Sequence, residues 1–418
     1  MTYASAEAFT WIFLAALAAY TATRLWLARR QIRHVLAHRE AVPPSFAASI
    51  PLAAHQKAAD YTVAKVKLGM TGAALDAAVL LALTLGGLLQ WLAERWAAAL
   101  PLGTLWHGAV LIVSVLALRA LIGLPLTLYR IFGIEERFGF NKMTPKLFVI
   151  DALKVIALAA VIGVPLLVLV LWLMAGAGRY WWLYVWGVLV VFSIVMQVLV
   201  PAFILPWFYK LSPLEDPALA ARVERLLGRC GFRSRGLYVM DGSKRSAHGN
   251  AFFAGVGAAK RIVLFDTLVE RLAPGEVEAV LAHELGHYKL NHIKKNLAIG
   301  FATTLAGLCV LGLLVGEPWF YAGLGVHAQT LAVALLLFLL VTPVFTFFLD
   351  PLAALLSRKY EFEADAYAVG HSAAEDLVHA LVKLYKDNSS TLTPDPLHSA
   401  FYDSHPPAAT RIARLRAA

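Results

Sequence analysis

The sequence predicts an all-α polytopic membrane protein: seven transmembrane helices with a small α/β domain outside the bilayer. Hydrophobic residues make up 60% of its 418 residues and charged residues only 15%, and the mean hydropathy is +0.67. Soluble domains contain about 25% charged residues, so this composition indicates an integral membrane protein. The apolar residues also gather in runs of bilayer-spanning length, interrupted by one long polar region from 205 to 295.

Seven apolar runs are long enough to cross a bilayer, which takes roughly 20 residues of helix. The run from 9 to 28 is longer than the apolar part of a secretory signal and its cations follow it, so we expect a retained first span. The other runs cover 73–92, 106–128, 149–174, 181–204, 296–316 and 328–350. Because seven is odd, we expect the two ends of the chain on opposite sides of the membrane.

Lys and Arg between the spans predict the orientation, because cytoplasmic loops are rich in them. The segments 29–67 and 130–146 are both rich in cations, whereas the loops on the other side contain only Arg95 and Arg179. We therefore expect the N-terminus on the outer side of the membrane, and the C-terminus and the region 205–295 on the cytoplasmic side.

The polar region carries the motif His283-Glu284-x-x-His287. On a helix the two histidines lie one turn apart on the same face, where both rings can bind one divalent cation. Pro274 and Glu276 near the start favour such a helix. Glu284 follows His283 and can reach a water molecule in an open metal position without being a ligand. The motif predicts a zinc site that activates water; the alternative is a structural metal site, which would need four protein ligands.

A third ligand must come from elsewhere in the chain. Cys230 lies in the polar region and Cys309 in an apolar run, so we expect His and carboxylate ligands rather than a cysteine site. The spacing that places a third histidine at position 293 is excluded, because that residue is Ile293. His292 points to another part of the helix, and we interpret it as a surface residue or a neighbour of the ligands.

The segment after the last span supplies the candidate. On a helix Glu361 and Asp365 share a face, whereas Glu363 points away from that pair. Glu361 can complete the zinc site, and Asp365 can accept the free ring N–H of a ligand histidine and fix its tautomer. The alternative is an ordinary pair of acids on a helix surface. With the histidine motif present, we favour Glu361 as the third ligand.

Short elements surround these motifs in the polar region. An amphipathic helix is predicted around 219–227, and strands are predicted at Leu237 to Met240 and at Arg261 to Phe265. In zinc peptidases an edge strand beside the metal helix holds an extended substrate by backbone hydrogen bonds. The mostly apolar stretch between the two strands suits this role, and its candidate substrate-binding residues are Asn250, Ala251, Phe252 and Phe253. The alternative is an ordinary core strand.

The charges indicate no nucleic-acid partner. The net charge is +10, but the cations are spread between apolar segments and form no basic patch with interleaved aromatic residues. Asp76 and Arg119 lie inside predicted spans, where charged residues are costly. We interpret both as members of a helix-to-helix pair or as part of the wall of a wet cavity.

Several segments together resemble the type I CAAX prenyl proteases. They are His283-Glu284-x-x-His287, Glu361-x-x-Ala364-Asp365, Ser243 to Phe252, Arg261 to Leu268, Glu135 to Lys142, and Ser404-His405-Pro406-Pro407 with Arg411. The resemblance covers nearly the whole chain and includes seven spans in the same order. It implies an integral-membrane zinc endopeptidase whose seven helices surround a water-filled chamber, with a zincin-like catalytic domain.

The resemblance also implies roles for single residues. It implies one Zn²⁺ per chain with Glu284 as the general base, and the implied ligands are His283, His287 and Glu361. His405 and Arg411 match family positions that bind the substrate backbone or stabilise the oxyanion. Members of the family cleave after a prenylated cysteine near a C-terminus, which implies a peptide or protein substrate that can be prenylated, and contact with membrane lipid.

Two other functions are compatible with these features. A quality-control protease for membrane proteins would use the same metal motifs without requiring a prenyl group. A transporter or binding protein with a structural zinc would not need Glu284. Usage of Ala, Leu and Arg favours a bacterial inner membrane, and a eukaryotic chain of this family would lie in the endoplasmic reticulum membrane.

Four parts of the chain are predicted. They are spans one to five with their loops (1–204), a cytoplasmic zinc-protease domain (205–295), spans six and seven (296–350), and a C-terminal catalytic segment carrying the third zinc ligand (351–418).

Overall fold

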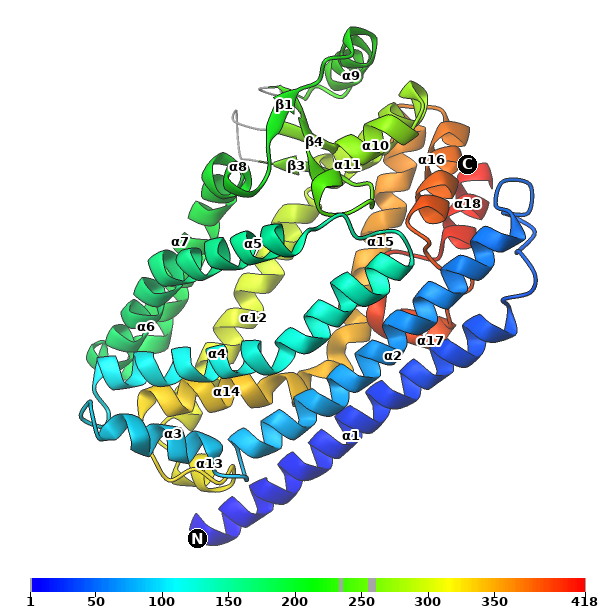
Figure 1. Cartoon of the computed structure of the whole chain (residues 1–418). Coiled ribbons are helices and arrows are strands. Elements are labelled where there is room, and N and C mark those ends of the chain that lie inside the picture. Colours follow the sequence, from blue (N-terminus) through cyan, green and yellow to red (C-terminus); the bar gives the residue numbers. More distant parts are fainter. Residues whose placement is uncertain (1, 233–235, 255–260, 418) are drawn as a thin grey trace.

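The computed structural model describes residues 2–232, 236–254 and 261–417. Most of them are helical, and Figure 1 shows long helices with a small sheet at one end of the molecule. Within these residues, seven helical segments are long and apolar enough to span a membrane, which confirms the predicted number. They are Ala4–Ala37, Leu52–Leu83, Leu105–Glu135, Pro145–Gly176, Gly178–Phe208, His292–Leu314 and Leu331–Val369.

Ten helices build these segments. They are α1 (Thr2–Ala37), α2 (Leu52–Leu83), α4 (Leu105–Leu128), α5 (Pro145–Leu158), α6 (Val164–Gly176), α7 (Trp181–Leu199), α8 (Leu205–Phe208), α12 (His292–Leu314), α14 (Leu331–Thr346) and α15 (Asp350–Val369). Two shorter helices, α3 (Leu88–Ala97) and α13 (Pro318–Ala322), lie at the end of the molecule away from the sheet (Figure 1).

The second span differs from its predicted range of 73–92. α2 ends at Leu83, and residues 88–92 belong to α3. Gly87, between the two helices, has φ +74°, a left-handed conformation that glycine adopts without strain. α2 also begins earlier than predicted, because its first half buries polar as well as apolar side chains, such as His55, Tyr61 and Thr62, while Lys57 and Lys67 stay exposed. Hydropathy alone does not detect such a helix.

The seventh segment connects the membrane to the candidate site. A short turn, Phe347–Leu349, joins α14 to α15, and Pro351 occupies the first turn of α15, where a missing N–H costs no helical hydrogen bond. α15 then continues to Val369, well past the predicted end at 350. One helical arm therefore carries Glu361 and Asp365 from the membrane-spanning part to the catalytic domain.

The sheet has four strands in the order β1-β2-β4-β3. They are β1 (Leu211–Pro213), β2 (Leu237–Met240), β3 (Ala251–Ala254) and β4 (Arg261–Phe265). The ranges of β2 and β4 are as predicted; these two strands pair in parallel, and β1 and β3 pair antiparallel on either side. Of the two alternatives for β3, the edge strand is confirmed within the described sheet.

Helices of the polar region and of the C-terminal segment share one hydrophobic core. They are α9 (Pro217–Arg229), α10 (Asp266–Arg271), α11 (Pro274–Lys289), α16 (Ala374–Asp387) and α18 (Ala408–Ala417), whereas α17 (Pro396–Tyr402) packs against α15. Leu281 and Leu285 of α11 are fully buried in this core with Leu264 of β4, Leu381 of α16 and Ile412 of α18 beside them. The core therefore fixes α11 between the sheet and the end of the chain.

A second core lies among the membrane-spanning helices. It contains Phe13, Leu111, Leu311 and Leu337, from four different spans. Within this part, Oδ2 of Asp76 on α2 lies 3.7 Å from Nη1 of Arg24 on α1. Asp76 thus takes part in a helix-to-helix pair, one of the two interpretations proposed for it.

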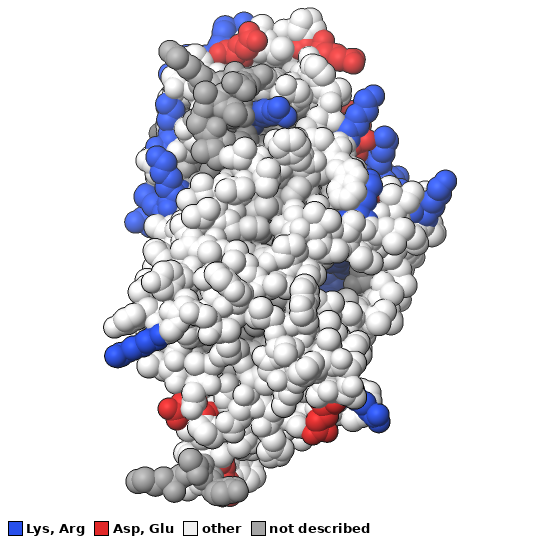
Figure 2. Space-filling model, turned by 90° about the vertical axis from the view of Figure 1, so that its left-hand side faces the viewer, with Lys and Arg blue, Asp and Glu red and all other residues white. Residues whose placement is uncertain are grey.

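Charged residues are distributed unevenly along the long axis. Figure 2 shows a broad band with few charged residues between two charged ends on the face it draws. Lys and Arg are more numerous toward the upper end, which is the end that carries the sheet in Figure 1. This distribution is typical of a protein that crosses a bilayer.

Candidate active site

α11 places the histidine motif beside α15. Its first turn is closed by Glu276, whose carboxylate accepts hydrogen bonds from the backbone N–H of Ala273 and from Lys383 Nζ, both at 2.7 Å. Further along, Gly286 lies against α15, because a Cβ there would be only 2.9 Å from Cα of Ala364. The absence of a side chain at Gly286 lets the two helices approach closely enough for their side chains to share one site.

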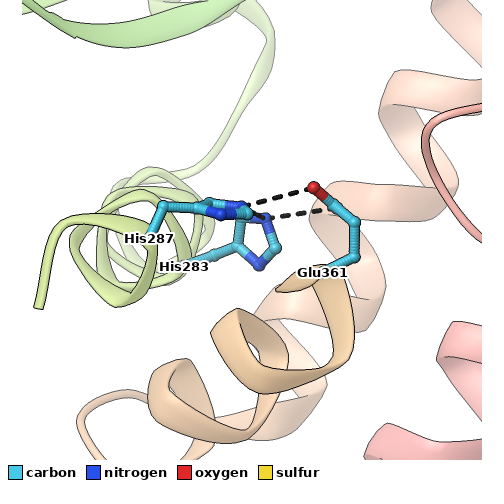
Figure 3. A group of neighbouring side chains, drawn as sticks. All are labelled: His283, His287 and Glu361. Carbon is cyan, nitrogen blue, oxygen red and sulfur yellow. Dashed lines mark hydrogen bonds and ion pairs between the residues drawn. The ribbon is translucent and has the colours of Figure 1, made fainter. Parts of the chain in front are cut away.

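Three predicted ligands meet between these helices (Figure 3). Nε2 of His283 lies 3.2 Å from Nε2 of His287 and 3.5 Å from Oε2 of Glu361. Nε2 of His287 lies 3.3 Å from Oε1 of the same carboxylate. Among the described residues, these three form the group of His, Cys, Asp or Glu side chains whose ligand atoms lie close enough together to hold one metal ion.

The donor set fits a zinc ion. Two nitrogens bound to zinc at about 2.0–2.1 Å in a tetrahedral site lie about 3.3 Å apart, close to the separation of the two histidine nitrogens. Oε2 of Glu361 is buried and makes no hydrogen bond, although Nη1 of Arg411 lies 3.2 Å away, so this oxygen keeps a lone pair free for a metal ion. Two histidines and one carboxylate are also the ligands of catalytic zinc sites, which keep a fourth position open.

Asp365 and Arg411 surround the ligands. Oδ1 of Asp365 lies 2.9 Å from Nδ1 of His283, as predicted for the partner that fixes the ring tautomer. Arg411 is buried and donates to both oxygens of Asp365, from Nε at 2.9 Å and from Nη2 at 2.6 Å. Its Nη1 lies 3.2 Å from Oε2 of Glu361. The guanidinium therefore compensates the two buried carboxylates.

Burial and hydrogen bonding change the protonation of two motif residues. Burial alone would lower the pKa of His283, but hydrogen bonds to Asp365 and Glu361 raise it to about 9. The metal-free ring therefore holds a proton that a metal ion must displace. Burial raises the pKa of Glu284, which makes its carboxylate a stronger base than an exposed glutamate.

A cavity of about 460 Å³ opens beside the motif. Its wall includes His283 and Glu284 from α11, Asn250 and Ala251 from the strand side, and, from the C-terminal segment, His405 and Arg411. Every predicted catalytic residue and part of the predicted substrate strand therefore border one space. His287 projects from the same helix as His283, and both rings point toward Glu361 (Figure 3).

His405 is the most exposed of the predicted catalytic residues. Its side chain is 61% exposed, and its Nε2 lies 3.4 Å from Oε1 of Glu361. Oγ of Ser404 lies 3.0 Å from Nδ1 of the same ring. Despite this exposure, the protein atoms around the ring lower the pKa of His405 by partial desolvation, and one nitrogen of the neutral ring carries a hydrogen.

The predicted substrate strand divides between the two faces of the sheet. Asn250 and Ala251 border the cavity, whereas Phe252 packs on the other face, in a small cluster with Met240 and Val263. This alternation follows from strand geometry, in which successive side chains point to opposite faces. The side chain of Phe253 lies outside the described part of the structure.

Sequence reasoning missed the contribution of α16. Leu377, Leu381, Leu384 and Tyr385 from this helix border the cavity, and so does Asn388 just after it. The leucines have ordinary helical spacing, which is the pattern of any amphipathic core helix. No chemical motif in this segment distinguishes a cavity wall from a buried face.

Comparisons with known proteins agree with this geometry. One family model, described as CAAX prenyl protease N-terminal with five membrane helices, matches residues 31–210, and the model of peptidase family M48 matches residues 213–418. A probable CAAX prenyl protease 1 of Schizosaccharomyces pombe is 33% identical over 93% of this chain and 84% of its own. The chain belongs to the CAAX prenyl protease family of M48 peptidases.

Other proteins of the prenyl protease family are also similar to this chain. CAAX prenyl protease 1 of Saccharomyces cerevisiae is 36% identical, over 72% of this chain and 70% of its own. The crystal structure of Saccharomyces mikatae Ste24p matches with a TM-score of 0.91 and 31% identity, covering 97% of this chain and 99% of that one. The family membership establishes a multi-pass membrane metallopeptidase, and the predicted fold class and enzyme class are confirmed.

Proposed function

We propose that this metallopeptidase uses one zinc ion to cleave peptide bonds near the C-terminus of prenylated CAAX-type substrates. The observation that carries the proposal is the convergence of His283, His287 and Glu361 beside a cavity that Glu284 and the β3 edge also border. The printed names of the relatives, CAAX prenyl proteases from yeasts to Homo sapiens, support the substrate class.

The residues around the cavity have distinct parts in this proposal. A bound zinc ion would lower the pKa of a water molecule to about 7 and polarise the scissile carbonyl. Glu284, whose pKa is raised, takes the proton of the attacking water and delivers it to the leaving nitrogen. His405 projects into the cavity and donates from Nε2 toward the developing oxyanion. Arg411 acts on the reaction through Glu361 and Asp365, to which its guanidinium is already bound.

The cavity wall suits aliphatic substrate side chains. Leu268, Leu377, Leu381 and Leu384 border it. A substrate extended along β3 would form backbone hydrogen bonds with the strand and place its side chains alternately against this wall. This arrangement favours a peptide with aliphatic residues beside the cleaved bond.

The low burial of the membrane-spanning helices supports an inner space between them. In six of the seven spans, at most 22% of the most apolar stretch is buried. Helices that face lipid on one side and a chamber for lipid-bearing substrates on the other would have such low burial. The abundance of Lys and Arg at the sheet end supports a cytoplasmic catalytic domain, and the composition favours a bacterial inner membrane.

Cleavage of paired peptides tests the proposal. The full chain in detergent is given a farnesylated C-a-a-X peptide and an unprenylated copy, beside Glu284→Gln. We expect cleavage of the farnesylated peptide, at least tenfold slower cleavage of the copy, and loss of at least 100-fold in the variant with zinc retained. Equal cleavage of both peptides would support a quality-control protease instead. Full activity in Glu284→Gln would support a structural zinc.

A further inference from the structure

His287 contacts another histidine through its outward ring nitrogen. Its Nδ1 lies 3.0 Å from Nδ1 of His292, the first residue of α12. Nε2 of His292 lies 2.9 Å from Oε2 of Glu363 on α15. His292 is only 2% exposed, and its ring stacks on Tyr360 with the centroids 4.2 Å apart. A buried polar chain therefore connects a zinc ligand to a carboxylate at the protein surface.

We propose that His292 and Glu363 position His287 for zinc binding and fix its tautomer; the proposal rests on the zinc site proposed above. When Nε2 of His287 binds a metal, the proton of the neutral ring is on Nδ1 and needs an acceptor. Nδ1 of His292 is that acceptor, so the proton of His292 must be on Nε2. That N–H donates to Glu363, and every donor in the chain faces an acceptor.

The two histidine ligands thus receive different support from one helix. His283 donates directly to Asp365, whose charge is already compensated by Arg411. His287 donates to a neutral ring, and the carboxylate that orients this ring, Glu363, is 34% exposed. Both carboxylates come from α15. Asp365 contacts His283, whereas Glu363 lies on another face of α15 and contacts His292 at the start of α12. Sequence reasoning placed Glu363 outside the ligand pair but did not connect it to His292.

Zinc affinity of the full chain in detergent, measured by competition with a fluorescent zinc chelator, tests the proposal. His292→Leu fills the place of the imidazole ring with an apolar side chain but leaves the Nδ1–H of His287 without an acceptor. We expect this variant to bind zinc about 10–100-fold more weakly, the usual effect of removing the outer partner of a metal ligand. His292→Asn keeps an oxygen near the place of Nδ1, and we expect it to recover most of the loss. A purely structural role would not produce this rescue.

If His292→Leu does not fold, a pair of variants at Glu363 still tests the proposal. Glu363 is partly exposed, so Glu363→Leu should fold; we expect it to lower zinc affinity about 3–10-fold, and Glu363→Gln, which keeps an acceptor, to stay near the wild type. Wild-type affinity in His292→Leu, or equal losses in His292→Leu and His292→Asn, would overturn the proposal. So would equal affinity in the two Glu363 variants.

A reference variant separates this proposal from the zinc site itself. Glu361→Ala removes a proposed ligand and should abolish tight binding. If Glu361→Ala binds zinc like the wild type, the proposed metal site is wrong. If Glu361→Ala loses zinc while His292→Leu keeps wild-type affinity, the metal site is right and only the role of His292 is wrong.

Discussion

Glu361 is the residue on which the active site depends most directly. Its two oxygens lie 3.3 Å from Nε2 of His287 and 3.5 Å from Nε2 of His283. The same carboxylate lies within 3.4 Å of Nε2 of His405 and 3.2 Å of Nη1 of Arg411. One side chain therefore links the proposed metal ligands to the groups that face the substrate.

Glu361→Ala should lose most of its zinc, because it removes one of three ligands and leaves the buried Arg411 without part of its counter-charge. We expect zinc content after purification to fall at least tenfold, measured by mass spectrometry. Glu375→Ala is the matched control, since it removes an exposed acid that does not border the cavity. Equal zinc in the two variants would assign the metal to other ligands.

Of the outer partners of the ligands, the sequence predicted Asp365 but left His292 open between a surface residue and a neighbour of the ligands. His283, His287 and Glu284 were predictable because their spacing places them on one helix face, and Glu361 because a single segment pairs it with Asp365. His292 contacts His287 only because α12 begins with a sharp turn at Asn291, which has φ 59°. A contact that depends on the angle between two helices leaves no pattern in the sequence.

Among the secondary-structure elements, the contact between α11 and α15 determines the spacing of the ligands. Gly286→Ala should separate these helices, because its Cβ would lie 2.9 Å from Cα of Ala364, a backbone atom that cannot move away alone. We expect a loss of about 1–3 kcal/mol in stability and weaker zinc binding, measured by thermal unfolding and chelator competition. Gly300→Ala in α12 is the control, since no atom lies within 4 Å of its added Cβ. Unchanged zinc affinity in Gly286→Ala would show that the spacing is not decisive.

The start of β3, the proposed substrate strand, is anchored by Asn388, just after α16. Its Oδ1 lies 3.3 Å from the backbone N of Gly249 and 3.3 Å from Nδ1 of His248. The ring of His248 stacks on Phe140, which joins this anchor to the loop after the third span. The strand that borders the cavity is therefore held from two parts of the fold.

Asn388→Leu should loosen this strand while leaving the metal ligands in place. Losing about 1 kcal/mol for each of two hydrogen bonds predicts a fall of about 5–30-fold in kcat/KM on the farnesylated peptide, with normal zinc content. Asn388→Asp keeps the accepting oxygen and should retain more activity. If the Leu and Asp variants are equally active, Asn388 does not position the strand.

Across the whole molecule, several polar contacts among the described residues join the membrane helices to the domain that carries the site, and the pair of Arg245 and Asp151 is one of them. Arg245, in the loop before β3, donates to both oxygens of Asp151 on α5, at 2.8 and 3.0 Å. Its guanidinium also lies over the ring of Tyr209, 4.4 Å from the centroid. The pair is largely buried, with side-chain exposures of 11% and 15%.

Removing either partner should destabilise this junction. We expect Asp151→Ala and Arg245→Ala each to lower the melting temperature, and the double variant to lose less than the sum, with a coupling of about 1–3 kcal/mol. Lys244→Ala, next to Arg245 but 63% exposed, should melt like the wild type. Additive losses in the double variant would mean that the two residues act independently.

The number and order of the spans were predictable because a bilayer requires about 20 apolar residues for each crossing. Their lengths were not, since the first half of α2 and the whole of α15 are polar enough to escape a hydropathy window but are held as helices by packing. β2 and β4 were predicted residue by residue from short apolar runs between turn residues. The Leu face of α16 could be recognised as buried, but not as a cavity wall, because packing and substrate binding favour the same side chains.

Anomalous diffraction at the zinc edge from crystals of the full chain carrying Glu284→Gln tests the central claim most directly. This substitution should leave the metal ligands intact while stopping turnover. The account predicts one zinc peak per chain, bound by Nε2 of His283, Nε2 of His287 and the carboxylate of Glu361, with the amide that replaces the Glu284 carboxylate facing the open position. A peak bound by other residues, or no peak in zinc-loaded crystals, would contradict it.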